Sequence, residues 1–132
     1  MDFITDIPES DRYDTILNLV DRLTKMSYCI SYRKDLDTRQ FTTLFMQHIE
    51  RLDGIPRYIL TDRGTLFPSG LWKQITQKLE IERKLSTAYH LQTEAQTDRT
   101  NVILEQYLQA YVNNQQDNWN YLLPLAQFVY NN

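Results

Sequence analysis

Three acidic residues in this sequence are spaced so that they can bind divalent metal ions. Asp2 lies in a short apolar run, Asp62 directly follows a second one, and residues 63–97 separate Asp62 from Asp98. Hard cations such as Mg²⁺ and Mn²⁺ prefer carboxylate oxygens, and two of them about 4 Å apart catalyse phosphodiester chemistry. The spacing therefore predicts a two-metal Mg²⁺ or Mn²⁺ site with Asp2, Asp62 and Asp98 as catalytic ligands.

Each of these acids also has a purely structural interpretation. Asp62 precedes Arg63-Gly64 and is a residue type that forms turns. Asp98 suits the first turns of a helix, where a negative charge is favourable. For Asp2 a functional role is favoured, because a charge in an apolar strand costs free energy unless it is paired or metal-bound.

The elements that position these acids follow from apolar patterning. Strands are predicted over residues 2–5, 15–22, 27–33, 57–61 and 82–85. Helices are predicted from Asp37-Thr38 to Leu52, from Pro68-Ser69 onward, over about 93–114, and after Asp117-Asn118. The run at 15–22 is almost continuously apolar, which is typical of a strand covered on both faces.

This order of elements predicts the fold class. Three strands with short connections come first, and strands joined by helices follow, so we expect an α/β domain with a mixed five-stranded sheet and helices on both faces. A chain of 132 residues with 42% hydrophobic residues suits one domain spanning 1–132. In such sheets, sites gather at strand ends where the strand order switches.

A series of ordered motifs resembles the catalytic core of retroviral and LTR-retrotransposon integrases, in particular the gypsy-type branch. The motifs are Met1-Asp2-Phe3-Ile4-Thr5, Val20-Asp21-Arg22-Leu23-Thr24-Lys25-Met26, Gly54-Ile55-Pro56, Thr61-Asp62-Arg63-Gly64, Ser86-Thr87-Ala88-Tyr89-His90, Leu104-Glu105-Gln106-Tyr107-Leu108 and Leu122-Leu123-Pro124-Leu125-Ala126. The resemblance covers the whole chain. It implies a ribonuclease H-like fold and metal-dependent DNA 3′-end processing and strand transfer.

The third acid departs from that family. Its motif ends Gln-Thr-Glu-Arg, whereas this chain has Gln96-Thr97-Asp98-Arg99. Asp is one methylene shorter than Glu, and a misplacement of about 1 Å can cost roughly 10² in rate. Glu94 stands where the family has Asp, and residues four apart share a helix face, so Glu94 is a further candidate ligand. Ala95 and Leu91 replace the family's Gly and Pro.

These departures leave two functions open. The first is an integrase-like core with impaired activity. The second is a non-catalytic, domesticated integrase remnant that acts as a dimerising protein-interaction module. The resemblance implies a homodimer formed through the first and last helices. His48, which lies on the apolar stripe of the first helix, is expected to be a packed residue and not a ligand.

Several residues near the acids are candidates for DNA contact: Arg63, Lys84, Tyr89, His90 and Arg99. The formal net charge is −3, whereas a dedicated nucleic-acid module is usually basic. We therefore expect the core alone to bind DNA weakly and without sequence preference.

Composition excludes some other classes. Two His and one Cys cannot build the zinc module that precedes the core in the integrases it resembles, so an excised core or a stand-alone relic is expected. The single cysteine, Cys29, fits an intracellular location, in the nucleus or cytoplasm. No apolar run reaches membrane-spanning length.

Overall fold

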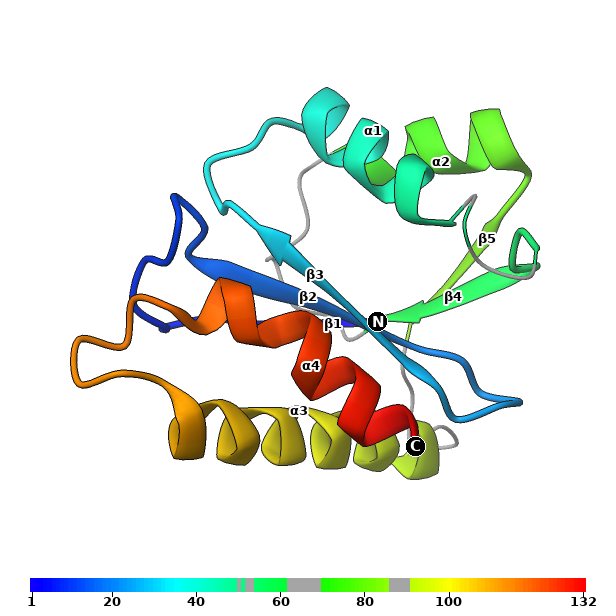
Figure 1. The fold of residues 1–132 in the computed structure, drawn as a ribbon. Helices are drawn as coiled ribbons and strands as arrows, with labels where there is room; N and C mark the ends of the chain where they lie inside the picture. The colour runs from blue at the N-terminus through cyan, green and yellow to red at the C-terminus, as the bar shows by residue number, and fades with distance from the viewer. Residues whose placement is uncertain (50, 52–53, 62–69, 86–90) are drawn as a thin grey trace. The chain divides into compact units, whose positions relative to one another are not determined.

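The protein forms two compact units in a computed structural model that describes residues 1–49, 51, 54–61, 70–85 and 91–132. The first unit comprises Met1–Lys34 with Ala88–Asn132, and the second comprises Asp35–Thr87. Along the chain the described elements follow the predicted order of three strands, a helix, a strand, a helix, a strand and two helices (Figure 1). That order confirms the α/β interpretation.

The first unit contains an antiparallel sheet of β1 (Asp2–Ile4), β2 (Thr15–Val20) and β3 (Ser27–Tyr32), in the order β1-β2-β3. In the register of this sheet Asp2 pairs with Asn18, and Asn18 pairs with Cys29. The first five residues of β2 are all buried, as its apolar run predicts.

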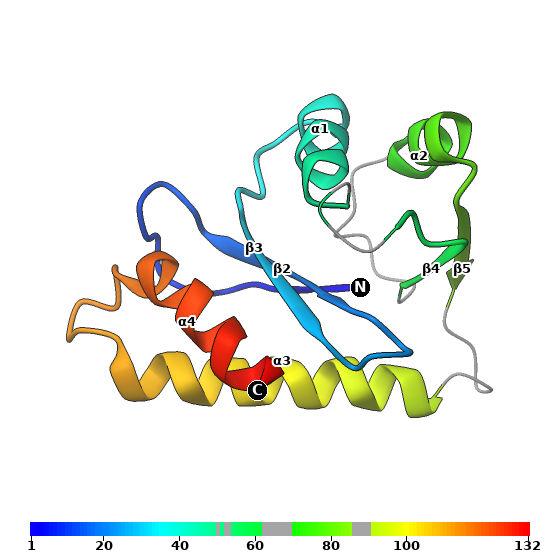
Figure 2. The ribbon, with the colours of Figure 1, turned by 45° about the vertical axis from the view of Figure 1, so that its right-hand side comes forward.

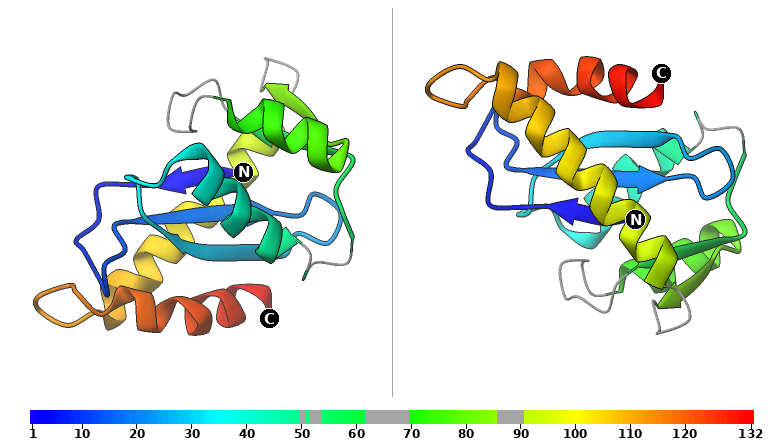
Figure 3. Two further views of the ribbon diagram at one scale, coloured as in Figure 1. Left: turned by 90° about the horizontal axis from the view of Figure 1, so that it is seen from above. Right: turned by 90° about the horizontal axis from the view of Figure 1, so that it is seen from below.

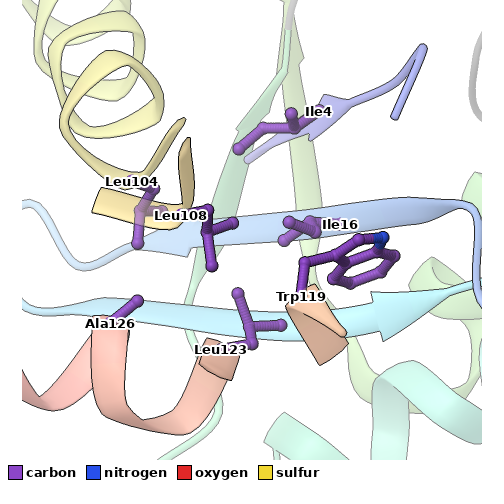
Figure 4. Close-up of a cluster of buried hydrophobic side chains, with 7 residues drawn as sticks. All are labelled: Ile4, Ile16, Leu104, Leu108, Trp119, Leu123 and Ala126. Atoms are coloured by element: carbon purple, nitrogen blue, oxygen red, sulfur yellow. The ribbon is translucent and has the colours of Figure 1, made fainter. Parts of the chain in front are cut away.

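Two helices pack against this sheet. In Figure 3, α3 (Leu91–Tyr111) crosses a face of the sheet and α4 (Trp119–Asn131) runs beside β3. Together they bury an apolar core, which Figure 4 shows: Ile4, Ile16, Leu104, Leu108, Trp119, Leu123 and Ala126. Val129 on α4 is not part of this core, and its side chain is 50% exposed.

The start of α4 is fixed by contacts from elsewhere in the chain. Asn118 occupies the N-cap position, as predicted, but its side chain does not cap α4 and instead accepts a hydrogen bond from the backbone N–H of Asn113 (3.0 Å). The backbone N–H of Asn120 donates to the Ser10 hydroxyl (3.1 Å). The Trp119 indole donates to the carbonyl oxygen of Pro8 (2.6 Å). Tertiary partners thus satisfy the first turn of α4.

Side-chain amides of α4 bind the backbone of β3. The Gln127 Oε1 atom accepts from the Cys29 N–H (2.7 Å). The Asn131 Oδ1 atom accepts from the Ser27 N–H (2.8 Å), and Asn131 Nδ2 donates to the Ser27 carbonyl (2.8 Å). These amides occupy backbone groups that an edge strand would otherwise offer to another chain.

The second unit pairs β4 (Tyr58–Thr61) with β5 (Glu82–Leu85) in parallel, and α2 (Leu71–Leu79) connects them (Figure 2). The remaining helix is α1 (Thr38–Ile49), whose buried stripe includes the stacked Phe41 and Phe45 rings. Leu52 and Pro68-Ser69 lie outside the described residues.

The described strands thus form a three-stranded antiparallel sheet in one unit and a parallel pair in the other. One joined five-stranded sheet and one domain over 1–132 stay predictions.

The amide clamp of Asn131 on Ser27 leads to a stability prediction. Asn131→Ala leaves the N–H and C=O of the buried Ser27 without their amide partner, so the free energy of unfolding should fall by about 1–3 kcal/mol. The control is Asn132→Ala, because Asn132 is exposed and its Nδ2 atom donates to the nearby Phe128 carbonyl oxygen of α4 (2.8 Å). Urea unfolding measures both variants, and equal effects would contradict the role of the clamp.

Candidate metal site

At the start of β1, both carboxylate oxygens of Asp2 accept hydrogen bonds. Its Oδ1 atom accepts from the backbone N–H of Phe3 (2.8 Å), and its Oδ2 atom accepts from Asn101 Nδ2 on α3 (2.9 Å). Donors on both oxygens fix the plane of the carboxylate. A carboxylate has about four acceptor positions, so these bonds are compatible with metal coordination.

Asn101 belongs to a row of polar side chains that continues into the sheet. Its Oδ1 atom accepts from Asn18 Nδ2 (2.7 Å), and Asn18 Oδ1 accepts from the Ser27 hydroxyl (2.7 Å). Asn18 and Ser27 are both fully buried. The register places Asn18 directly beside Asp2, which explains why the same α3 residue contacts both.

Neither Asn18 nor Asn101 was among the residues singled out from the sequence. A signal was present for Asn18, since it interrupts the apolar run Ile16-Leu17-Asn18-Leu19-Val20. A buried amide in a central strand needs hydrogen-bond partners, which is a reason to look for a polar site nearby. For Asn101 no such signal exists, because an Asn on an amphipathic helix is usually solvated.

Asp98 lies three residues before Asn101 on α3, and its side chain is exposed. Residues three apart are neighbours on a helix surface, so Asp98 lies one turn from the side chain that contacts Asp2. On the other flank of α3, the Thr100 hydroxyl is hydrogen-bonded to the Tyr130 hydroxyl of α4 (2.8 Å). Asp98 lies about 160° around the helix from Thr100 and therefore on the flank that faces away from α4.

The other predicted site residues are described in part or not at all. Asp62, Arg63, Tyr89 and His90 lie outside the described residues. Lys84 belongs to β5 and Glu94 to α3, but their side chains are not described. Arg99 is exposed on α3. The convergence of Asp2, Asp62 and Asp98 therefore stays a prediction.

The donor chemistry of the described acids suits a hard cation. Asp2 and Asp98 offer carboxylate oxygens, which Mg²⁺ and Mn²⁺ prefer over nitrogen and sulfur. Within the described part of the chain, no group of three or more His, Cys, Asp or Glu side chains is placed to hold a metal ion. Asp62, the other acid that the spacing predicts as a ligand, lies outside the described residues.

Cys29, next to this polar row, is unsuited to catalysis or metal binding. Burial raises the pKa of its thiol from 9.0 to about 11, against the opposing effect of a hydrogen bond with the Ser27 hydroxyl. The thiol therefore stays protonated at neutral pH, whereas a nucleophile or ligand must be a thiolate.

His48, which was expected to be a packed residue, contacts its own helix, with Nδ1 2.8 Å from the Leu44 carbonyl oxygen.

The motif around Asp21 forms the turn of the hairpin between β2 and β3. The hydroxyl of Thr24 donates to the Asp21 carboxylate (2.7 Å), as does the backbone N–H of Leu23 (3.0 Å). These bonds, that of Thr24 first, lower the pKa of Asp21 and hold the turn. Beyond the turn, Lys25 Nζ donates to Gln96 Oε1 (3.1 Å), which connects the hairpin to the part of α3 that carries Asp98.

Known proteins resemble this chain over its full length. The chain is 34% identical over 132 residues to the transposon Tf2-3 and Tf2-4 polyproteins of Schizosaccharomyces pombe. These matches cover all of this chain and 10% of each polyprotein, so the chain spans about a tenth of the length of these relatives. No protein-family model matches the chain.

No helix in the described ranges is long and apolar enough to cross a membrane.

Solved structures of integrase catalytic cores are similar in fold to this chain. The catalytic core domain of BIV integrase matches with a TM-score of 0.65 at 17% identity, over 95% of this chain and 79% of that one. The HTLV-2 integrase catalytic core domain in complex with magnesium, in its dimeric form, matches with a TM-score of 0.68 at 18% identity, over 96% and 81%. The fold is thus that of the ribonuclease H-like integrase cores. The full-chain likeness to the transposon polyproteins and the fold of the integrase catalytic cores both agree with the family that the motifs predict, the retroviral and LTR-retrotransposon integrase cores.

Proposed function

We propose that this chain is the catalytic core for metal-dependent DNA 3′-end processing and strand transfer, with activity reduced by Asp98 in place of Glu. The observation that carries the proposal is the carboxylate of Asp2, held at the start of β1 by Asn101 of α3, one turn from Asp98. The likeness of the whole of this chain to a tenth of the transposon Tf2-3 polyprotein supports a role in DNA integration.

In this proposal Asp2, Asp62 and Asp98 hold two Mg²⁺ or Mn²⁺ ions, and Glu94 is an additional ligand. A pair of such ions supplies an activated water and stabilises the charge that develops on the attacking and leaving oxygens. The magnesium complex of the HTLV-2 integrase core supports this choice of metal. Asp2 is the ligand whose position is fixed, by its hydrogen bond from Asn101. The third acid, Asp98, lies on α3.

DNA is the proposed substrate, and the core alone holds it weakly. Its 17 acidic residues outnumber its 14 Lys and Arg residues, so few phosphates can be neutralised. Arg99 on α3, together with Arg63, Lys84, Tyr89 and His90, is proposed to contact the backbone near the acids. We propose that the chain acts on DNA in the nucleus or the cytoplasm.

A second candidate function is that of a dimerising interaction module. An exposed apolar stripe on α4 favours it, because Tyr121, Leu125, Phe128 and Val129 are 50–70% exposed at helical spacing. We propose that a second copy of the chain covers this stripe. The apolar stripe of α1, which was expected to share in the interface, is buried within its own unit. The dimeric form of the HTLV-2 integrase core supports this pairing. A dimer is compatible with both functions, so metal binding separates them.

Metal binding should raise the melting temperature of the isolated chain. A ligand at ten times its Kd stabilises the folded state by about 1.4 kcal/mol. For a chain of this size that corresponds to a rise of roughly 3–6 °C, which calorimetry in Mg²⁺ or Mn²⁺ measures. Asp2→Asn should abolish the shift, whereas Glu9→Gln, an exposed acid outside the site, should keep it. No shift with either metal would favour the interaction module.

Asp98→Glu should increase strand-transfer or disintegration activity. The longer side chain restores the methylene that the integrase motif has, and recovering about 1 Å of reach is worth roughly ten- to a hundredfold. Gel assays with labelled DNA ends in Mn²⁺ measure the rate. Glu94→Gln in the natural background tests whether Glu94 has replaced Asp98 as the third ligand. A fully active natural chain that loses rate on Asp98→Glu would contradict the impairment.

The α4 stripe should control the oligomeric state. Phe128→Lys places a charge in the proposed interface and should weaken the dimer about tenfold or more, as expected for a central apolar anchor. Leu23→Lys is the control, since Leu23 is also apolar and is 88% exposed at the β2–β3 hairpin. Sedimentation velocity measures the monomer fraction. A dimer that survives Phe128→Lys would show that the interface lies elsewhere.

A further inference from the structure

Asn18 is an unusual residue for its position. It is fully buried in the middle of β2, whose neighbouring residues Leu17 and Leu19 are apolar. An apolar side chain of similar size satisfies the packing there, whereas a buried amide is tolerated only when its donor and acceptor are both bonded. Both are bonded here, to Asn101 and to Ser27.

The direction of these hydrogen bonds follows from the charge on Asp2. An ionised carboxylate only accepts, so Asn101 must present its Nδ2 group to Asp2 and its Oδ1 atom to Asn18. Asn18 must then donate through Nδ2, which turns its own Oδ1 atom toward Ser27. The Ser27 hydroxyl completes the row as the donor. Each group therefore fixes the orientation of the next amide.

The far end of the row is anchored by α4. Asn131 accepts from the Ser27 N–H and donates to the Ser27 carbonyl, both at 2.8 Å. The position of Ser27, and through it the orientation of Asn18, thus depends on the packing of α4 against β3. The row connects the last helix of the chain to the carboxylate at its beginning.

We propose that Asn18 is a positioning residue, which holds the Asn101 carboxamide so that its N–H group points at Asp2 and fixes that carboxylate for metal binding. This inference rests on the proposed function, since it concerns the metal site of the same reaction. Residues that orient a metal ligand from behind commonly change metal affinity tenfold or more when they are removed.

A double-mutant cycle on Mn²⁺ affinity tests whether Asn18 acts through Asn101. Asn101→Leu should weaken Mn²⁺ binding about tenfold or more. Asn18→Leu should weaken it about three- to tenfold in the natural background, the factor that one ordinary hydrogen bond contributes. In the Asn101→Leu background, Asn18→Leu should have no further effect. Isothermal titration with Mn²⁺ alone measures all four proteins. If Asn18→Leu is poorly folded, Asn18→Val, whose branched side chain suits a central strand, replaces it.

The matched control is Asn120→Leu. Asn120 also connects a helix to the sheet, through a hydrogen bond from the Ser31 hydroxyl, but it is not part of the row that ends at Asp2. Its loss should lower the melting temperature and leave Mn²⁺ affinity unchanged. Unchanged affinity in Asn18→Leu, or an equal loss in both backgrounds, would overturn the proposal.

A second readout needs no metal. In the natural chain one side-chain N–H of Asn101 donates to the Asp2 carboxylate, so the NMR shifts of its two amide protons should be well separated. Asn18→Leu removes the bond that holds the Oδ1 side and should bring the two shifts closer together. If the natural chain binds no Mn²⁺, the proposed function fails, and this spectrum alone decides the role of Asn18. An Asn101 side-chain signal that is identical in Asn18→Leu overturns that role.

Discussion

The hydrogen bond from Asn101 to Asp2 is the contact on which the site depends. It joins the second residue of the chain to a helix almost a hundred residues later, and it holds a charged group that would otherwise be costly in an apolar strand. Bonds to charged acceptors are stronger than neutral ones, so this contact fixes the start of β1 as well as the carboxylate. Asp98 lies on the same surface of α3, one turn away. The packing of α3 on the sheet therefore sets the geometry of both described acids.

That packing depends in turn on α4. Its buried side, with Trp119, Leu123 and Ala126, shares one core with α3 and the sheet, and its amides bind the backbone of β3. Its other side carries the exposed apolar stripe. A partner that covers the stripe would press on the helix that anchors Ser27, and the polar row leads from Ser27 to Asp2. The exposed stripe and the amide that holds Ser27 thus belong to the same helix of the first unit.

Sequence reasoning predicted the elements well because their patterns are local. The apolar run of β2, the stripe of α1 and the order of strands and helices all follow from periodicity, and the fold class followed from that order. Asn118 was expected to cap α4, but Ser10, more than a hundred residues away, does so. Asn18 and Asn101 were missed for a related reason: their role arises from strand register and helix packing, which no local pattern encodes.

The central claim is that Asp2, fixed by Asn101, binds a divalent metal, and paramagnetic broadening tests it most directly. Substoichiometric Mn²⁺ is titrated into ¹⁵N-labelled protein while the backbone and side-chain amide signals are followed. If the account is correct, the signals of the Asn101 carboxamide and the Phe3 N–H broaden first, whereas those of Asn113 and Asn114, beyond the far end of α3, stay sharp. Uniform broadening, or sharp Asn101 signals while another region broadens, would contradict the assignment of this site.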